Sequence, residues 1–239
     1  MRLDGICSLY ASALTMKDKT ILYVHGMGGN GHDGFYWRLA ECLDNRLLTS
    51  DTESFQARVV TFDYDFDPEE AQEQIAGAIN LHHPDLIVAT SLGAFHTLMF
   101  PNIPRVLVSP ALNAGKVIAR IGEELKKNPF KRFMLEISLG SSEGCQALTA
   151  NPRVLKKFQA LAAKIDRNVE NLKNCPAYAV YGGNDMYMQM NVVNPKHFEA
   201  IFNSVDYDII PSYDHNFNGF DVIGYVEPKI YELLGFNKD

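Results

Sequence analysis

A serine stands at the centre of a short motif whose residue types suit covalent catalysis. Residues 89–93 read Ala-Thr-Ser-Leu-Gly and join a buried-strand pattern to a helical stretch. A nucleophilic serine at such a junction needs small residues two places before and after it, because the chain turns sharply to expose the hydroxyl. Ala89 and Gly93 provide them around Ser91. Ser91 is therefore a candidate nucleophile, although serine is also a favoured helix N-cap, and this segment alone leaves both interpretations open.

A second serine matches the nucleophile pattern more literally. Residues 140–144 read Gly-Ser-Ser-Glu-Gly, with Ser142 at the centre. The run before it, residues 133–139, lies outside the alternation of strands and helices described below. Because the motif requires a strand before it and a helix after it, we expect Ser142 not to be the nucleophile.

A glycine-rich loop follows the first expected strand and suits the stabilisation of negative charge. Residues 25–30 read His-Gly-Met-Gly-Gly-Asn. Glycines let the backbone turn tightly and bring an N–H group close to a substrate oxygen. The loop lacks the Lys-Ser/Thr ending of a phosphate-binding loop. We expect His25 to brace this loop through hydrogen bonds rather than to transfer protons.

A carboxylate and an imidazole follow the last two expected strands. Asp185 ends the sequence Gly-Gly-Asn-Asp, and His215 ends the sequence Tyr-Asp-His. Taken singly, each is typical of an ordinary turn or surface loop. Together with Ser91 they give the order nucleophile, acid, base, each at the end of an expected strand. This conjunction indicates a Ser-His-Asp arrangement.

Short runs rich in β-branched residues alternate with helical stretches, and these elements must position the candidate residues. Expected strands cover 20–24, 57–62, 85–90, 105–109, 177–181 and 205–210; expected helices cover 35–43, 68–80, 91–100, 152–173 and 220–234. The alternation predicts an α/β fold with a mainly parallel six-stranded sheet and helices on both faces. Ligands of such sheets bind at the carboxyl ends of the strands, where the candidate residues stand.

Residues 111–174 interrupt this alternation with a mainly helical stretch. We expect them to form a helical cap insertion, and residues 1–110 and 175–239 to form the core. The insertion holds twelve lysines and arginines against six acidic residues, a net charge of +6, while the remaining residues carry −13. One interpretation is a solvated face that helps to dock the insertion on the core. The other is that some of these cations attract an anionic substrate.

Taken as an ordered set, these segments resemble the α/β-hydrolase superfamily. The matching segments are the strand followed by His25 and Gly26, the turn at 89–93, residues 183–185, and the pair 214–215. The shortness of the chain, the His-Gly loop and the Val-Ser-Pro-Ala run at 108–111 are similar to small bacterial esterases of the YqiA type. The resemblance implies Ser91 as nucleophile, His215 as base and Asp185 as the acid that orients it.

The resemblance also implies an oxyanion hole made by the backbone N–H groups of Met27 and Leu92, with His25 and Gly26 supporting the loop. It implies no metal and no cofactor. The superfamily's two leading antiparallel strands have no counterpart in residues 1–19, so we expect a trimmed sheet. The expected activity is hydrolysis of a carboxylic ester through an acyl-enzyme. A thioesterase, an amide-cleaving or acyl-transfer enzyme with the same residues, and a non-catalytic binding module remain alternatives.

The composition of the chain excludes several broad classes of protein. Of its 239 residues, 46% are hydrophobic and 21% are charged, which is typical of a globular protein rather than a disordered one. The net charge of −7 argues against general nucleic-acid binding. No apolar run approaches the ~18 residues of a membrane span. Four cysteines without a C-x-x-C pair indicate free thiols, so we expect a cytoplasmic protein acting on a small-molecule acyl substrate.

Overall fold

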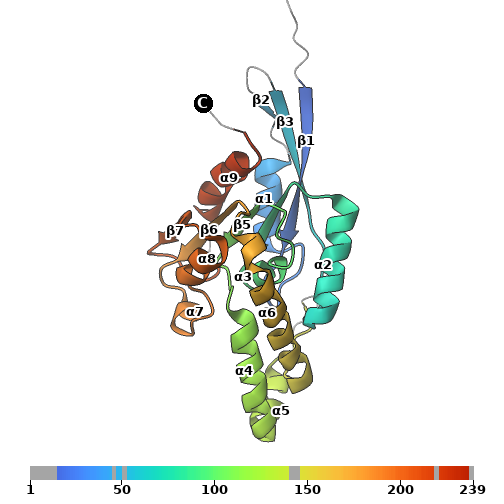
Figure 1. The fold of residues 1–239 in the computed structure, drawn as a ribbon, viewed down its shortest axis with the longest axis vertical. Helices are drawn as coiled ribbons and strands as arrows, with labels where there is room; N and C mark the ends of the chain where they lie inside the picture. Colours follow the sequence, from blue (N-terminus) through green and yellow to red (C-terminus); the bar gives the residue numbers. More distant parts are fainter. Residues whose placement is uncertain (1–14, 45–46, 50–52, 140–145, 218–220, 237–239) are drawn as a thin grey trace, which may run out of the picture.

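Seven strands form one sheet at the centre of the molecule (Figure 1). The computed structural model describes residues 15–44, 47–49, 53–139, 146–217 and 221–236. The strands are β1 (Thr15–Val24), β2 (Leu47–Thr49), β3 (Glu53–Val60), β4 (Leu86–Thr90), β5 (Arg105–Val108), β6 (Ala177–Gly182) and β7 (Tyr207–Ile210). Their order in the sheet is β2-β3-β1-β4-β5-β6-β7.

The six parallel strands confirm the predicted sheet, and one antiparallel strand adds to it. Strands β3, β1, β4, β5, β6 and β7 pair in parallel, whereas β2 pairs antiparallel with β3 at the edge. The three-residue β2 is too short to show an alternating pattern, so the sequence did not predict it. Strand β1 also begins at Thr15, five residues before the predicted start at Thr20, and pairs with β3 along this extension.

Helices cover both faces of the sheet, as the alternation predicted. They are α1 (Gly34–Leu43), α2 (Pro68–His82), α3 (Ser91–Thr97), α4 (Ala114–Lys127), α5 (Pro129–Leu139), α6 (Pro152–Leu172), α7 (Met186–Gln189), α8 (Pro195–Phe202) and α9 (Asp221–Leu233). Side chains alternate between the faces of a strand, so each strand contributes to two cores. One core joins the sheet to α1 and α9, and the other joins it to α2, α3, α6 and α8.

Capping residues set the starts of the long helices. The carboxylate of Asp67 accepts the N–H of Glu69 at the start of α2, and the side chain of Asn151 accepts the N–H of Arg153 at the start of α6. Each cap is followed by proline at the first helical position, where a missing N–H costs nothing. The same Asn-Pro pattern begins α8, which the sequence analysis did not predict, as it did not predict α5 and α7.

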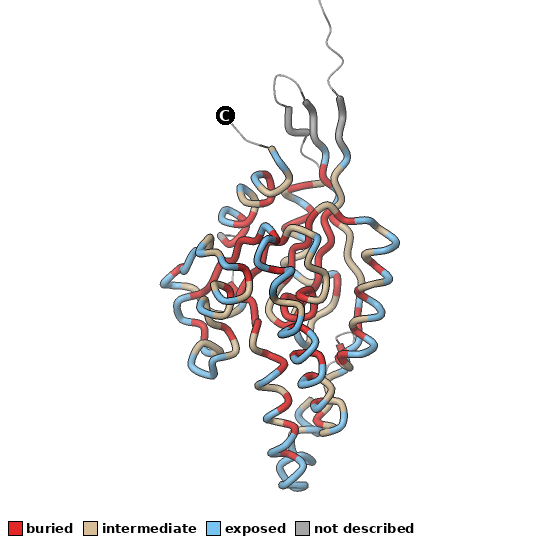
Figure 2. Tube along the Cα trace, in the orientation of Figure 1, coloured by how far each residue is buried: buried red, intermediate tan, exposed pale blue. Residues whose placement is uncertain are grey.

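The helices of the predicted insertion differ in how they pack. Helix α6 buries Leu155, Phe158 and Ile165 in the same core as strands β1, β4 and β5. Helix α4 packs along α6, whereas α5 has no buried residue. Figure 2 shows this change as the red of the sheet giving way to pale blue at the lower end, where Figure 1 labels α5. The division into core and cap stays a prediction.

Candidate active site

Ser91 occupies a strained turn between β4 and α3. Its φ of +46° lies in the left-handed region, which costs a non-glycine residue energy. A side chain at Gly93 would collide with the backbone carbonyls of Val24 and His25, and a Cβ at Gly26 would lie 3.1 Å from the Cβ of Ser91. Close backbone approach therefore requires the glycine that the motif predicted at position 93, and the other small residue, Ala89, is fully buried.

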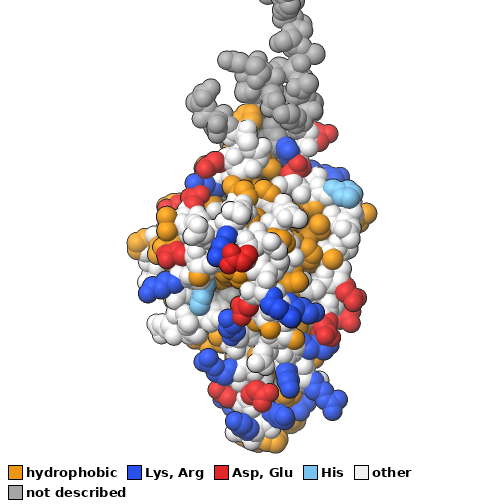
Figure 3. Space-filling view, viewed as in Figure 1, with side chains coloured by type: hydrophobic (Ala, Val, Ile, Leu, Met, Phe, Trp, Pro, Cys, Tyr) orange, Lys and Arg blue, Asp and Glu red, His pale blue; other side chains and the backbone are white. Residues whose placement is uncertain are grey.

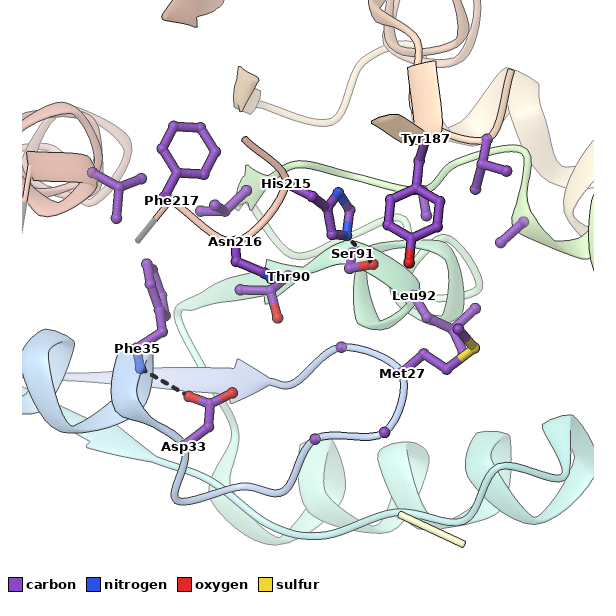
Figure 4. Close-up of a pocket in the computed structure, with 18 of the residues that line it drawn as sticks. Met27, Asp33, Phe35, Thr90, Ser91, Leu92, Tyr187, His215, Asn216 and Phe217 are labelled. Atoms are coloured by element: carbon purple, nitrogen blue, oxygen red, sulfur yellow. Dashed lines mark hydrogen bonds between the residues drawn. The ribbon is translucent and has the colours of Figure 1, made fainter. Parts of the chain in front are cut away.

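The structure brings Ser91, His215 and Asp185 together from the ends of three parallel strands. The Oγ of Ser91 lies 2.9 Å from Nε2 of His215, and Nδ1 of His215 lies 2.7 Å from Oδ2 of Asp185. Figure 4 shows the first of these hydrogen bonds at the centre of the pocket. An ionised carboxylate only accepts hydrogen bonds, so Nδ1 carries the proton and Nε2 accepts from the serine hydroxyl.

Asp185 is held in place from its other side. It is 3% exposed, and its Oδ1 accepts the backbone N–H of Tyr187 at 2.8 Å, which caps the short helix α7. The ring of Tyr187 packs edge-on against the imidazole of His215, with centroids 4.6 Å apart. The neighbouring carboxylate of Asp214 accepts the backbone N–H of Asn216 instead. Geometry thus assigns Asp185, and not Asp214, to the histidine.

The glycine-rich loop lies beside Ser91 with its histidine turned inward. His25 is fully buried, its Nδ1 lies 2.8 Å from the carbonyl oxygen of Gly26, and its ring stacks on Tyr64. Burial lowers the pKa of this imidazole. Within the described part of the chain, no hydrogen bond uses the backbone N–H of Met27 or Leu92. Both residues line the pocket, and the oxyanion hole at their N–H groups stays a prediction.

Gln146, which lies outside the predicted core, forms hydrogen bonds with this loop that no sequence motif predicted. Its Oε1 accepts the N–H of Gly28 at 3.1 Å, and its own backbone N–H donates to the carbonyl of Gly29 at 2.9 Å. Its Nε2 donates to the carbonyl oxygen of Tyr64 at 3.1 Å. A lone glutamine far from the loop in sequence carries no local signal for such a role. Ser142, the rejected candidate nucleophile, lies outside the described residues.

A pocket of about 590 Å³ opens around Ser91. Figure 4 shows Met27, Leu92 and Tyr187 to one side of the serine and Asp33, Phe35 and Phe217 to the other. Helix α4 contributes only apolar side chains to the lining, and the charged ones come from α1 and its N-cap. The α4 residues are Ala114, Val117, Ile118 and Ile121, and the charged lining residues are Asp33 and Arg38.

The pocket corrects one interpretation of the basic insertion. All twelve lysines and arginines of residues 111–174 are described, and none of them lines the pocket. Four of them pair with acids instead: Lys157 with Asp67 and Glu69, Lys116 with Asp166, Lys131 with Glu124, and Lys173 with Glu170. The insertion therefore adds no cation to the pocket lining, which counts against the interpretation that its cations attract an anionic substrate.

Solved structures identify the architecture. Est1E from Butyrivibrio proteoclasticus, solved with ferulic acid bound, has a TM-score of 0.62 at 15% identity, over 91% of this chain and 90% of that one. The alpha/beta hydrolase GrgF from Penicillium sp. sh18 has a TM-score of 0.58 at 12% identity, over 94% and 93%. The chain has the α/β-hydrolase fold. A thioesterase domain from the curacin biosynthetic pathway matches at a TM-score of 0.50 and 15% identity, over 90% and 89%.

The α/β-hydrolase fold confirms the fold that the resemblance implied, and the closer resemblance to esterases of the YqiA type stays a prediction. No protein-family model and no curated protein sequence matches the chain. In this chain the antiparallel strand at the sheet edge is β2, residues 47–49, which comes between β1 and β3 in the sequence. None of the helices in the described residues combines the length and the apolar character needed to cross a membrane.

Proposed function

We propose that this protein is a serine hydrolase that cleaves carboxylic esters through an acyl-enzyme intermediate. One observation carries the proposal: Ser91, His215 and Asp185 form a continuous hydrogen-bonded chain at 2.9 and 2.7 Å inside a pocket. The strained φ of Ser91 supports it, because such strain persists where function requires it. The hydrolases among its structural relatives support hydrolysis as the class of reaction.

The first half of the reaction forms the acyl-enzyme. The Oγ of Ser91 attacks the ester carbonyl carbon while Nε2 of His215 takes the hydroxyl proton. Asp185 accepts from Nδ1, which keeps Nε2 free to receive the proton and stabilises the imidazolium. The N–H groups of Met27 and Leu92 donate to the oxyanion, each contributing about 3 kcal/mol by analogy with measured oxyanion donors. The C–O bond then breaks, and His215 gives its proton to the leaving alkoxide.

The second half of the reaction hydrolyses the acyl-enzyme and regenerates the free serine. His215 takes a proton from a water molecule, whose oxygen attacks the acyl carbon. The tetrahedral intermediate collapses with Ser91 as the leaving group, His215 returns the proton to Oγ, and the carboxylic acid leaves. The apolar side chains of α4 form a wall for the hydrocarbon part of the ester, so we propose a substrate with an apolar acyl or alcohol group.

Covalent labelling with a fluorophosphonate probe tests the nucleophile. The probe traps an activated serine, so we expect it to label the native chain and the Ser142→Ala variant. Ser91→Ala should lose labelling, and turnover of short esters should fall on the order of 10⁴-fold or more. Labelling lost in Ser142→Ala but retained in Ser91→Ala would show that the wrong serine has been assigned.

A substrate panel tests the leaving group. Matched oxygen esters, thioesters and anilides with the same acyl chain differ only in the bond that is cleaved. We expect the highest kcat/KM for the oxygen esters, and a preference for thioesters or anilides would replace the ester assignment with one of those. A chain that neither labels nor turns over any of them would be a binding module on this fold.

A further inference from the structure

Helix α5 exposes an apolar face that no described part of the chain covers. Phe130, Phe133, Met134 and Ile137 follow the helical spacing of one face, and they are 74%, 61%, 52% and 58% exposed. Leu135 and Leu139 lie on the opposite side and pack toward the core. Large aromatic side chains exposed in a group mark an interaction site more often than single exposed apolar residues do.

Basic residues lie close to this face in the chain. Residues 126–135 contain four cations, no acid and three of the exposed apolar side chains. Lys126, Lys127 and Arg132 are exposed and form no ion pair with any described residue, while Lys131 lies 3.9 Å from Glu124. The nearby acid Glu136 is turned away, toward Thr149 and the backbone of Ala150. Figure 3 shows blue cationic side chains at the lower end of the molecule, with fewer red acidic side chains and orange hydrophobic atoms among them.

We propose that α5 and the end of α4, residues 126–137, dock on the surface of an anionic phospholipid membrane. An exposed apolar helix face rimmed by lysine and arginine suits insertion at the headgroup boundary, with cations at the phosphates and phenyl rings in the acyl region. The charge distribution favours the same partner, since the insertion carries +6 and the rest of the chain −13. In this orientation the positively charged insertion faces the anionic surface, and the negatively charged remainder of the chain faces away from it.

Helix α4 connects the proposed docking segment, residues 126–137, to the pocket. Ile121 lines the pocket, and Lys127 lies six residues later on α4, about 9 Å along the helix axis. Docking of residues 126–137 would therefore hold the pocket close to the membrane surface. This placement fits an ester with an apolar group that partitions into lipid, but membrane docking itself does not depend on the proposed esterase activity.

Vesicle co-sedimentation of the full chain tests the proposal. Vesicles of phosphatidylcholine alone are compared with vesicles of phosphatidylcholine and phosphatidylglycerol, at low and high salt. We expect the chain to pellet with the anionic vesicles and to be released by salt, because each cation near the surface contributes electrostatically. Ser91→Ala should pellet equally well, so the assay stands even where the esterase assignment fails.

Two sets of variants distinguish the contribution of the apolar face to vesicle binding from that of the nearby cations. Phe130→Ser with Phe133→Ser should weaken binding to anionic vesicles by at least about tenfold, because two phenyl rings are lost from the interface. Lys126→Ser, Lys127→Ser and Arg132→Ser together should weaken it on the order of 100-fold and reduce its salt dependence. Leu81→Ser is the matched control, since Leu81 is 73% exposed on α2 and should leave binding unchanged.

Two results would overturn the proposal. One is a native chain that stays in the supernatant with anionic vesicles at low salt. The other is a native chain that sediments as a dimer in velocity experiments and becomes a monomer in the Phe130→Ser, Phe133→Ser variant, because a second copy would then cover the face. Equal loss of binding in Leu81→Ser would also count against α5 as the docking element.

Discussion

At the scale of single residues, the site depends on a choice between two neighbouring carboxylates. Asp185 and Asp214 both lie near His215, but only Asp185 reaches its Nδ1. Asp185 follows β6 in a glycine turn, where a side chain at Gly182 would collide with the backbone of Asp214. The tight contact of these two loops is what directs one carboxylate to the imidazole and leaves the other to cap its own turn.

Replacing Asp185 by asparagine should abolish most activity without unfolding the chain. The amide keeps the size of the carboxylate but no longer selects the tautomer with a proton on Nδ1, so Nε2 cannot accept from Ser91. We expect kcat to fall on the order of 10⁴-fold by analogy with serine proteases, measured on a short water-soluble ester. Asp214→Asn is the control and should keep kcat near the original value. Full activity in Asp185→Asn would move the acid elsewhere.

At the scale of elements, Gln146 in the segment before α6 reaches across to the glycine-rich loop. Gln146 is 8% exposed and links the N–H of Gly28 to the carbonyl of Tyr64, whose hydroxyl in turn donates to the carbonyl of His25. Gly28 has a φ of +73°, so the loop needs support in a conformation that few residues adopt. Gln146 is therefore a positioning residue for the proposed oxyanion hole.

Gln146→Ala should lower kcat about tenfold while KM changes little. The oxyanion forms only in the transition state, so a misplaced N–H of Met27 weakens transition-state binding rather than substrate binding. The loss of two hydrogen bonds should also lower the free energy of unfolding by about 2 kcal/mol. Steady-state kinetics and urea unfolding measure both effects.

Two further variants separate positioning from general destabilisation. Gln146→Glu keeps an acceptor for the N–H of Gly28 but loses the donor to the carbonyl oxygen of Tyr64, so it should restore only part of the lost kcat. Exposed Gln56 on β3 is distant from the site, and Gln56→Ala should leave both quantities unchanged. A Gln146→Ala variant whose KM rises while kcat stays constant would contradict the positioning role.

At the scale of the whole molecule, a buried histidine couples folding to pH. His96 on α3 is fully buried beside Phe158 and Tyr64, and Gln72 Nε2 lies 3.1 Å from its Nδ1. Burial lowers its pKa to about 3. In the unfolded chain the imidazole titrates near ~6.5, so between these values the unfolded state binds a proton that the folded state does not. Stability is therefore retained above ~6.5 and is lost as the pH falls toward 3.

His96→Leu should flatten this pH dependence. From the linkage relation, the native chain should lose about 2 kcal/mol of unfolding free energy from His96 alone between pH ~7 and pH ~5, and the variant should lose correspondingly less. Buried His25, whose pKa burial also lowers, should leave a remaining slope in the same direction. Urea unfolding at both pH values measures the difference. A variant with the native slope would place the titrating group elsewhere, and exposed His32→Leu serves as the control.

The position of the insertion's charges also predicts a kinetic result. Its cations do not line the pocket, and salt screens charge interactions through water over about 8–10 Å. We therefore expect the ratio of kcat/KM for anionic and neutral esters not to fall as salt is added. Paired esters that differ by one carboxylate, measured from low to high salt, provide the test. A ratio that falls steeply with salt would restore the idea that the insertion attracts anionic substrates.

Local patterns in the sequence determined the parts of this protein that depend on neighbouring residues. The turn at Ser91 follows from a buried strand, two small residues and a helix, all within a short segment, because sharp backbone turns tolerate few residue types. The parallel sheet follows from alternating strand and helix patterns, and the ends of its strands place Asp185 and His215 at one edge.

The tertiary structure decided what depends on residues distant in sequence. Gln146 contacts Gly28 across 118 residues, and no local pattern specifies such a hydrogen bond. Helices α5 and α6 are both amphipathic in sequence, yet α6 joins the core while α5 keeps its apolar face exposed. A pattern states that a face is apolar, but only packing states what covers it, because burial depends on which surfaces meet in space.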